Sequence, residues 1–214
     1  MSDLHKAVSV GDTQGLVGLT FDDAYGDFLY TAVPVLKKFN FSATVFAVAG
    51  MLGESNTWKH TYNHESRKRL LMAEELREVL KQGMEVGAHS MTHAKLLDLS
   101  EEQVHQEVSK SGRLLAEVLG SVVEGFCYPY GSSDDATVRA VRDAGYTYAC
   151  GVHISTDDDV HNLPRLPISD RDGLLRFAAK LRAYPQYHRF SATVHPYYAG
   201  LKAAYVKLRE QRPA

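Results

Sequence analysis

The sequence predicts an α/β protein whose parallel strands close into a barrel or an incomplete barrel. Three observations support this fold class. Short apolar runs alternate with amphipathic segments, at least six such units fit into 214 residues, and no internal repeat or low-complexity stretch interrupts them. Strands that alternate with helices in this way are typical of βαβ units, in which the strands run parallel.

The apolar runs predict the strands, and the amphipathic segments predict the helices. Each apolar run is four to six residues long, which is the length of a buried strand. The longest amphipathic segment begins with Ser100 and has Gln103 three residues later, a capping box that marks a helix start. We expect strands at residues 16–21, 43–47, 84–88, 125–128, 146–149 and 191–194, and helices at residues 29–39, 73–82, 100–119, 134–144, 173–182 and 202–211.

A length of 214 residues fits one domain, residues 1–214, and also allows two small ones, and the composition is that of an ordinary soluble protein. Hydrophobic residues make up 44% of the chain and charged residues 23%, and the formal net charge is -2. This charge does not indicate a nucleic-acid-binding surface. The two cysteines, Cys127 and Cys150, lie in apolar segments and are expected to be buried free thiols. The sequence shows neither a signal-peptide core nor a transmembrane run, so we expect a cytoplasmic protein.

Two adjacent carboxylates follow the first predicted strand. The apolar run at 16–21 leads directly into Asp22 and Asp23. Burying adjacent carboxylates without a cation is costly, so a metal or a basic side chain is expected beside them. The alternative is a pair of aspartates at a helix N-cap.

A pair of histidines follows the third predicted strand. His89 and His93 are four residues apart, and a helical turn would place both imidazoles on one face, within reach of one ion. The alternative is two unrelated loop histidines. His60 and His64 have the same spacing, but they lie in a polar segment away from any strand end, so we do not expect a metal there.

Two further candidates follow predicted strands. Tyr130 lies in a Pro-Tyr-Gly turn. The turn-forming preference of proline and glycine alone can explain this sequence, and the alternative is that the turn aims a backbone N–H into a site. His195 follows the run at 191–194, where a lone histidine is often structural. The carboxyl ends of parallel barrel strands form the active-site face, so these residues are expected to lie on the same face as Asp22, Asp23 and the histidine pair.

Two histidines and one carboxylate leave coordination positions open, as in hydrolytic zinc sites. Zinc lowers the pKa of bound water to about 7 and polarises a carbonyl, and the second carboxylate could act as a base. Cobalt or nickel could also serve with these ligands.

The polar segment 50–69 is predicted to be a long loop over one face of the barrel, as long loops often carry function. It contains the single tryptophan, Trp58, which we expect to offer an aromatic face to a sugar ring. The alternative is that Trp58 packs into the barrel rim.

These residues resemble the motifs of the polysaccharide deacetylases, carbohydrate esterase family 4. Thr20-Phe-Asp-Asp-Ala24 resembles the family's TFDDG motif, and His89-Ser-Met-Thr-His93 matches its histidine motif fully. Phe126-Cys-Tyr-Pro-Tyr-Gly131 is similar to the FAYPYG branch, and His195 after an apolar strand matches a further motif. The resemblance covers residues 16–195.

The resemblance implies a distorted (β/α)7 barrel that removes acetyl groups, mostly from N-acetylglucosamine units, with a divalent metal. It implies Asp23, His89 and His93 as metal ligands and Asp22 as general base. It also implies His195 as general acid and the Tyr130 backbone N–H as an oxyanion donor. The expected partner is an acetylated sugar or oligosaccharide.

The chain departs from the family pattern at three places. Ala24 replaces a glycine, the usual aspartate/tryptophan motif is not evident at 155–172, and Cys127 replaces the arginine that pairs with the base in the RxPYG form. Arg165 is the expected substitute, because it lies between two prolines in an extended apolar segment, where a solvated arginine has little reason to be. The alternative partner for Arg165 is the acidic run 157–159.

Two other functions remain open from the sequence. One is an amidase that acts on another amide or imide, possibly cyclic, on the same scaffold. The other is a non-catalytic sugar-binding module, although loss of Asp22 or of a ligand would have favoured it and neither is lost.

Overall fold

The computed structural model describes residues 1–10, 16–58, 67–152 and 159–181. Its centre is one six-stranded sheet in the order β1-β2-β3-β4-β5-β6, and all five strand pairs are parallel. The strands are β1 (Thr20–Phe21), β2 (Thr44–Ala47), β3 (Glu85–Ala88), β4 (Gly125–Cys127), β5 (Tyr148–Gly151) and β6 (Leu163–Pro164). This curled half-barrel confirms the predicted α/β class with parallel strands.

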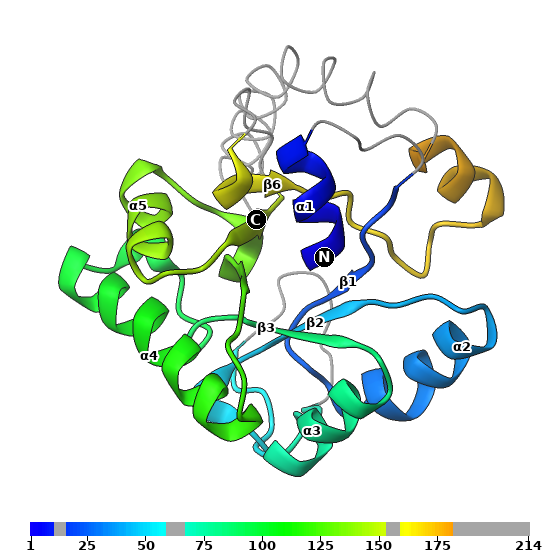
Figure 1. Cartoon of the computed structure of the whole chain (residues 1–214), viewed down its shortest axis with the longest axis horizontal. Helices are drawn as coiled ribbons and strands as arrows, with labels where there is room; N and C mark the ends of the chain where they lie inside the picture. Colours follow the sequence, from blue (N-terminus) through cyan, green and yellow to red (C-terminus); the bar gives the residue numbers. More distant parts are fainter. Residues whose placement is uncertain (11–15, 59–66, 153–158, 182–214) are drawn as a thin grey trace, which may run out of the picture.

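The helices lie around the outside of the curved sheet (Figure 1). They are α2 (Val33–Lys38), α3 (Ala73–Lys81), α4 (Glu101–Leu119) and α5 (Asp135–Asp143). A further helical segment covers residues 174–181. Ser100 and Gln103 form the predicted capping box at the start of α4. The central strands are buried on both faces, as expected of a parallel sheet covered by helices.

Several details differ from the sequence prediction. β1 is only two residues long, because Leu16 and Val17 are exposed and pair with no described strand. The helix expected at 29–39 begins with a π-helical turn, Phe28–Ala32, and continues as α2. Pro34 follows this turn closely, and proline lacks the backbone N–H that an α-helical hydrogen bond needs. β6 was not predicted, because it is only two residues long and Pro164 is one of them.

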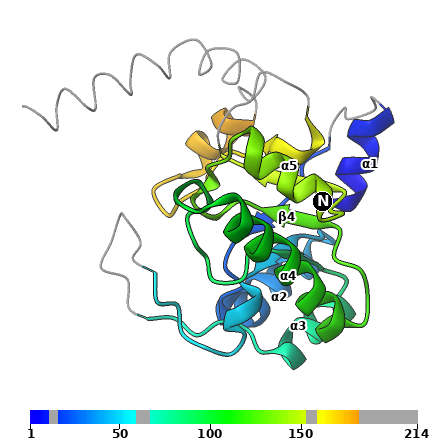
Figure 2. The same ribbon diagram turned by 90° about the vertical axis from the view of Figure 1, so that its left-hand side faces the viewer.

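The helix α1 (Ser2–Val10), which the sequence did not predict, lies against the amino ends of the strands. The Met1 ammonium contacts Glu85 at the start of β3, 2.9 Å away, and His5 stacks on Tyr148 at the start of β5. Figure 2 shows α1 on the opposite side of the molecule from the segment around residue 55. Among the described residues, α1 therefore lies at the end of the sheet opposite the carboxyl ends of the strands.

The two cysteines are buried and free, as predicted. None of the described helices is long and apolar enough to span a lipid bilayer. The strand expected at 191–194 and the helix expected at 202–211 lie outside the described residues.

Candidate metal centre and active site

The candidate residues come from the carboxyl ends of four strands. Asp22 and Asp23 follow β1, His89 follows β3, Tyr130 follows β4 and Arg165 follows β6. These strands belong to one parallel sheet, so their carboxyl ends meet at one edge.

The backbone at this edge is strained. Six non-glycine residues among those described have a positive φ, and five of them belong to the strand-end motifs. Such conformations cost about 1–3 kcal/mol each and concentrate at functional sites, where the surrounding structure holds them. The five residues are Asp23, Ala24, Ser90, His93 and Tyr130.

Asp23, His89 and His93 form a compact, buried group. Their ligand atoms all lie within 4.8 Å of one another. The Asp23 Oδ1 atom is 3.5 Å from His89 Nε2 and 3.2 Å from His93 Nε2. Ligand atoms at about 2.0–2.2 Å from a tetrahedral zinc lie about 3.3–3.6 Å apart, so these separations fit one zinc-sized ion.

The electrostatics of the group also suit a cation. Burial lowers the pKa of His89, which keeps the imidazole neutral and able to act as a ligand. Burial would raise the pKa of Asp23, but the hydrogen bond with His93 and the two nearby imidazoles outweigh it and hold the pKa below its usual range. Asp23 is therefore an ionised carboxylate beside the neutral imidazole of His89.

The histidine-bearing turn is held by residues that the sequence reading missed. Ser90 Oγ accepts the backbone N–H of His93 at 3.0 Å. Glu107 of α4 accepts the backbone N–H groups of Met91 and Thr92, each at 2.9 Å. No local pattern indicates Glu107, because its partners lie 15 and 16 residues away on another element.

Asp22 lies beside the ligand group and is paired with Arg165. The Arg165 Nη1 and Nη2 atoms are 2.7 and 2.9 Å from the two Asp22 carboxylate oxygens. Loss of solvent around the carboxylate would raise the pKa of Asp22, but the charge and the hydrogen bonds of Arg165 outweigh this effect and lower the pKa to about 2. The Asp22 side chain remains 38% exposed, so the ionised carboxylate is open to a substrate or water.

The expected contact between Arg165 and Asp22 is thus present. Of the acidic run proposed as the alternative partner, Asp159 is 2.9 Å from Arg142. Residues 157 and 158 lie outside the described residues.

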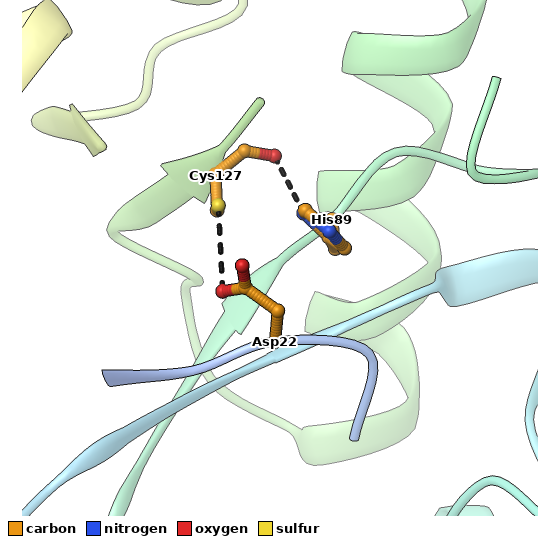
Figure 3. A group of neighbouring side chains, drawn as sticks. All are labelled: Asp22, His89 and Cys127. Atoms are coloured by element: carbon orange, nitrogen blue, oxygen red, sulfur yellow. Dashed lines mark hydrogen bonds between the residues drawn. The ribbon is translucent and has the colours of Figure 1, made fainter. Parts of the chain in front are cut away.

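Cys127 is hydrogen-bonded both to the base candidate Asp22 and to the ligand candidate His89 (Figure 3). Its thiol lies 3.5 Å from Asp22 Oδ1, and its backbone carbonyl accepts His89 Nδ1–H at 2.8 Å. The latter bond leaves His89 Nε2 for a metal. Asp22, His89 and Cys127 form a second possible ligand group, but it suits a metal less well, because Arg165 already pairs with Asp22 and burial raises the pKa of the thiol.

The aromatic candidates border the same group. Trp58 stacks on the His93 imidazole with ring centroids 4.2 Å apart, and the Tyr130 ring meets the same imidazole edge-on at 4.8 Å. Tyr130 has a φ of 61° in the turn after β4. His195, His60 and His64 lie outside the described residues, as do residues 59–66 of the predicted loop 50–69.

Comparisons with known proteins agree with this fold. The sequence model of the polysaccharide deacetylase family matches residues 9–149. The poly-beta-1,6-N-acetyl-D-glucosamine N-deacetylase of Staphylococcus aureus is 28% identical over 166 residues, which are 72% of this chain and 54% of that enzyme. The chain thus spans about half the length of the relatives it matches.

Solved structures are similar as well. The Streptococcus pyogenes deacetylase PplD, solved with acetate, superimposes with a TM-score of 0.70 at 22% identity, over 83% of this chain and 76% of that one. IcaB from Ammonifex degensii superimposes with a TM-score of 0.65 at 25% identity, over 77% and 72% of the two chains. With a family match over residues 9–149, which is more than half of the chain, this chain belongs to the polysaccharide deacetylase family.

Proposed function

We propose that this chain is a metal-dependent hydrolase that removes acetyl groups from an N-acetylated amino sugar or oligosaccharide. The observation that carries the proposal is the convergence of Asp23, His89 and His93 beside the ion pair of Asp22 and Arg165. The Staphylococcus aureus relative is an N-deacetylase of poly-beta-1,6-N-acetyl-D-glucosamine, which supports an amide-linked acetyl group as the target.

Asp23, His89 and His93 would hold one divalent metal. Zinc is the metal that two imidazoles and a carboxylate suit best, and cobalt or nickel could also bind to these ligands. When bound, such an ion lowers the pKa of a water to about 7 and polarises the acetyl carbonyl.

Asp22 would act as the general base. Its pKa of about 2 keeps the carboxylate ionised throughout the neutral range, so it can accept a proton from the attacking water. Arg165 contacts both carboxylate oxygens and thereby fixes the orientation of the group.

Two further groups would complete the reaction. The Tyr130 backbone N–H would donate to the carbonyl oxygen as that oxygen gains negative charge, in the manner of an oxyanion hole. His195 would protonate the amine as it leaves, because an amine is a poor leaving group without a proton.

The decisive experiment measures acetate release from a small panel of acetylated sugars. The purified chain should release acetate, a chelator should abolish the release, and added Zn²⁺ should restore it. Hydrolytic ring opening of a cyclic amide, with no acetate released from the sugars, would favour the amidase alternative. Binding of sugars without release of acetate would favour a sugar-binding module.

A further inference from the structure

The two histidine ligands are held in different ways. A metal-bound histidine usually donates its other ring N–H to a carboxylate, a carbonyl or a water, and this bond fixes the ring plane. His89 follows this rule, since its Nδ1–H donates to the Cys127 carbonyl at 2.8 Å. His93 does not: its Nδ1 atom is buried, and within the described part of the chain it has no hydrogen-bond partner.

Aromatic rings surround the His93 imidazole instead. The Trp58 indole lies nearly parallel to it, with ring centroids 4.2 Å apart and an interplanar angle of 17°. The Tyr130 ring meets it edge-on, at 4.8 Å and 67°. The His89 ring lies 5.0 Å away at 66°. The imidazole is therefore confined on one face by Trp58 and at its sides by two other rings.

The position of Trp58 is set by a clamp at the base of its segment. Asn56, which is buried, accepts the Lys68 backbone N–H through its side chain at 2.7 Å and donates its own backbone N–H to the Lys68 carbonyl at 3.0 Å. Ser55 and Arg69 form an antiparallel bridge next to this pair. These contacts fix the backbone two residues before Trp58.

From this arrangement we infer that Trp58 is a positioning residue for the metal ligand His93. The indole face sets the plane of the imidazole and keeps Nε2 directed at Asp23, a task that a hydrogen bond performs for His89. This inference rests on the proposed metal site. It also changes the role expected for Trp58, because the indole face that contacts His93 is not available to a sugar ring.

The chain offers a direct readout of this contact. Trp58 is its only tryptophan, so all tryptophan emission reports on the ring stacked against His93. Apoprotein prepared with a chelator would be titrated with Zn²⁺ and, separately, with paramagnetic Co²⁺. We expect the emission to change with Zn²⁺, to be quenched by Co²⁺, and to saturate at one equivalent of either. Stoichiometric metal uptake with unchanged emission would overturn the inference.

Variants test the energetic role. Zn²⁺ affinity would be measured by competition with a chromophoric chelator for Trp58→Leu and Trp58→Phe. Aromatic pairs of this kind are worth a factor of about three to ten in an equilibrium constant, so Trp58→Leu should weaken binding by about that factor and Trp58→Phe should restore most of it. Phe39→Leu is the matched control, because Phe39 is an exposed ring stacked on Phe41 and should leave affinity unchanged.

The outcomes separate this inference from the proposed function. Equal Zn²⁺ affinity of the wild-type and Trp58→Leu proteins, with a raised KM for sugar, would make Trp58 a substrate contact and overturn the inference alone. A wild-type protein that binds no Zn²⁺ would overturn the metal site itself and the inference with it. If Trp58→Leu fails to fold, the wild-type emission titration and the Zn²⁺ affinity of Trp58→Phe still test whether Trp58 positions His93.

Discussion

Arg165 and Asp22, 143 residues apart in the sequence, form a two-pronged ion pair with N–O distances of 2.7 and 2.9 Å. The same guanidinium also donates to Cys127 Sγ at 3.0 Å and to Thr20 Oγ1 at 3.0 Å. The arginine thus approaches the base from β6, and the position that carries an arginine in the RxPYG form of the motif is taken by a neutral thiol.

Replacing Arg165 should change the pH profile of the reaction. Arg165 lowers the pKa of Asp22, and the proposed base works in its ionised form, so activity should fall as the pH drops through that pKa. In Arg165→Met the pKa rises, and the acidic limb of the kcat/KM profile should move to higher pH. Arg142→Met is the control, because Arg142 pairs with Asp159 and should leave the limb in place. An unmoved limb in Arg165→Met would end this assignment.

Asp22→Asn should keep the metal and lose most of the turnover. Asparagine nearly preserves the shape of the side chain but removes the basic lone pair, and general bases contribute about 10²–10⁴-fold in rate. Metal content and kcat would be measured on the same preparation. Asp27→Asn, which changes an exposed aspartate near Lys68, should have neither effect. Near-normal turnover of Asp22→Asn would show that Asp22 is not the base.

Asp23→Ala and His89→Ala should lose bound metal. Each substitution removes one of three converging ligand atoms, and the remaining two cannot hold an ion as tightly. Metal analysis after dialysis is the measurement, with His105→Ala as the control, because the His105 side chain contacts Ser109 on the exposed face of α4. Full occupancy in both ligand variants would contradict the assignment.

His195→Ala should lower kcat more than it raises KM. A protonated imidazole donates to the leaving amine in the transition state, so its loss should appear mainly in the chemical step. Steady-state kinetics on folded protein measures this. A variant with reduced stability but equal activity per folded molecule would instead indicate a structural histidine.

Glu75→Gln should lower stability in a pH-dependent way. Two hydrogen bonds from Arg69, at 2.6 and 2.8 Å, lower the pKa of Glu75 from its ordinary value of 4.5 to about 2, against the opposing effect of burial. Because the folded-state pKa is depressed, the stabilisation is present above about pH 4.5 and is lost as the pH falls toward 2. The variant should therefore be less stable at neutral pH, by about 1–3 kcal/mol.

The measurement is denaturant unfolding of both proteins at several pH values. The difference between wild type and Glu75→Gln should shrink between pH 4.5 and 2. Glu74→Gln is the matched control, since Glu74 is exposed in the same helix turn and pairs only loosely with Arg77, at 3.5 Å. A difference that does not depend on pH would contradict the role of this ion pair.

The sequence alone determined the fold class and the principal cluster of the site. Apolar runs of strand length, separated by amphipathic helices, specify parallel strands, and parallel strands bring their carboxyl ends to one edge. Asp23, His89 and His93 each follow such a run closely, so their convergence could be predicted without coordinates of any kind. The contact between Arg165 and Asp22 could also be predicted from the sequence, because two prolines and an apolar segment leave few places for the arginine side chain.

Only the tertiary structure decided what holds these groups in place. The stacking of Trp58 on His93, the Glu107 contacts with the histidine turn and the bond from His89 to the Cys127 carbonyl join separate elements. None of these three contacts leaves a periodic pattern in the sequence, because each depends on how a loop or helix packs across the edge of the sheet. Periodicity reports which face of an element is buried, whereas the partner of a particular side chain is set by long-range packing.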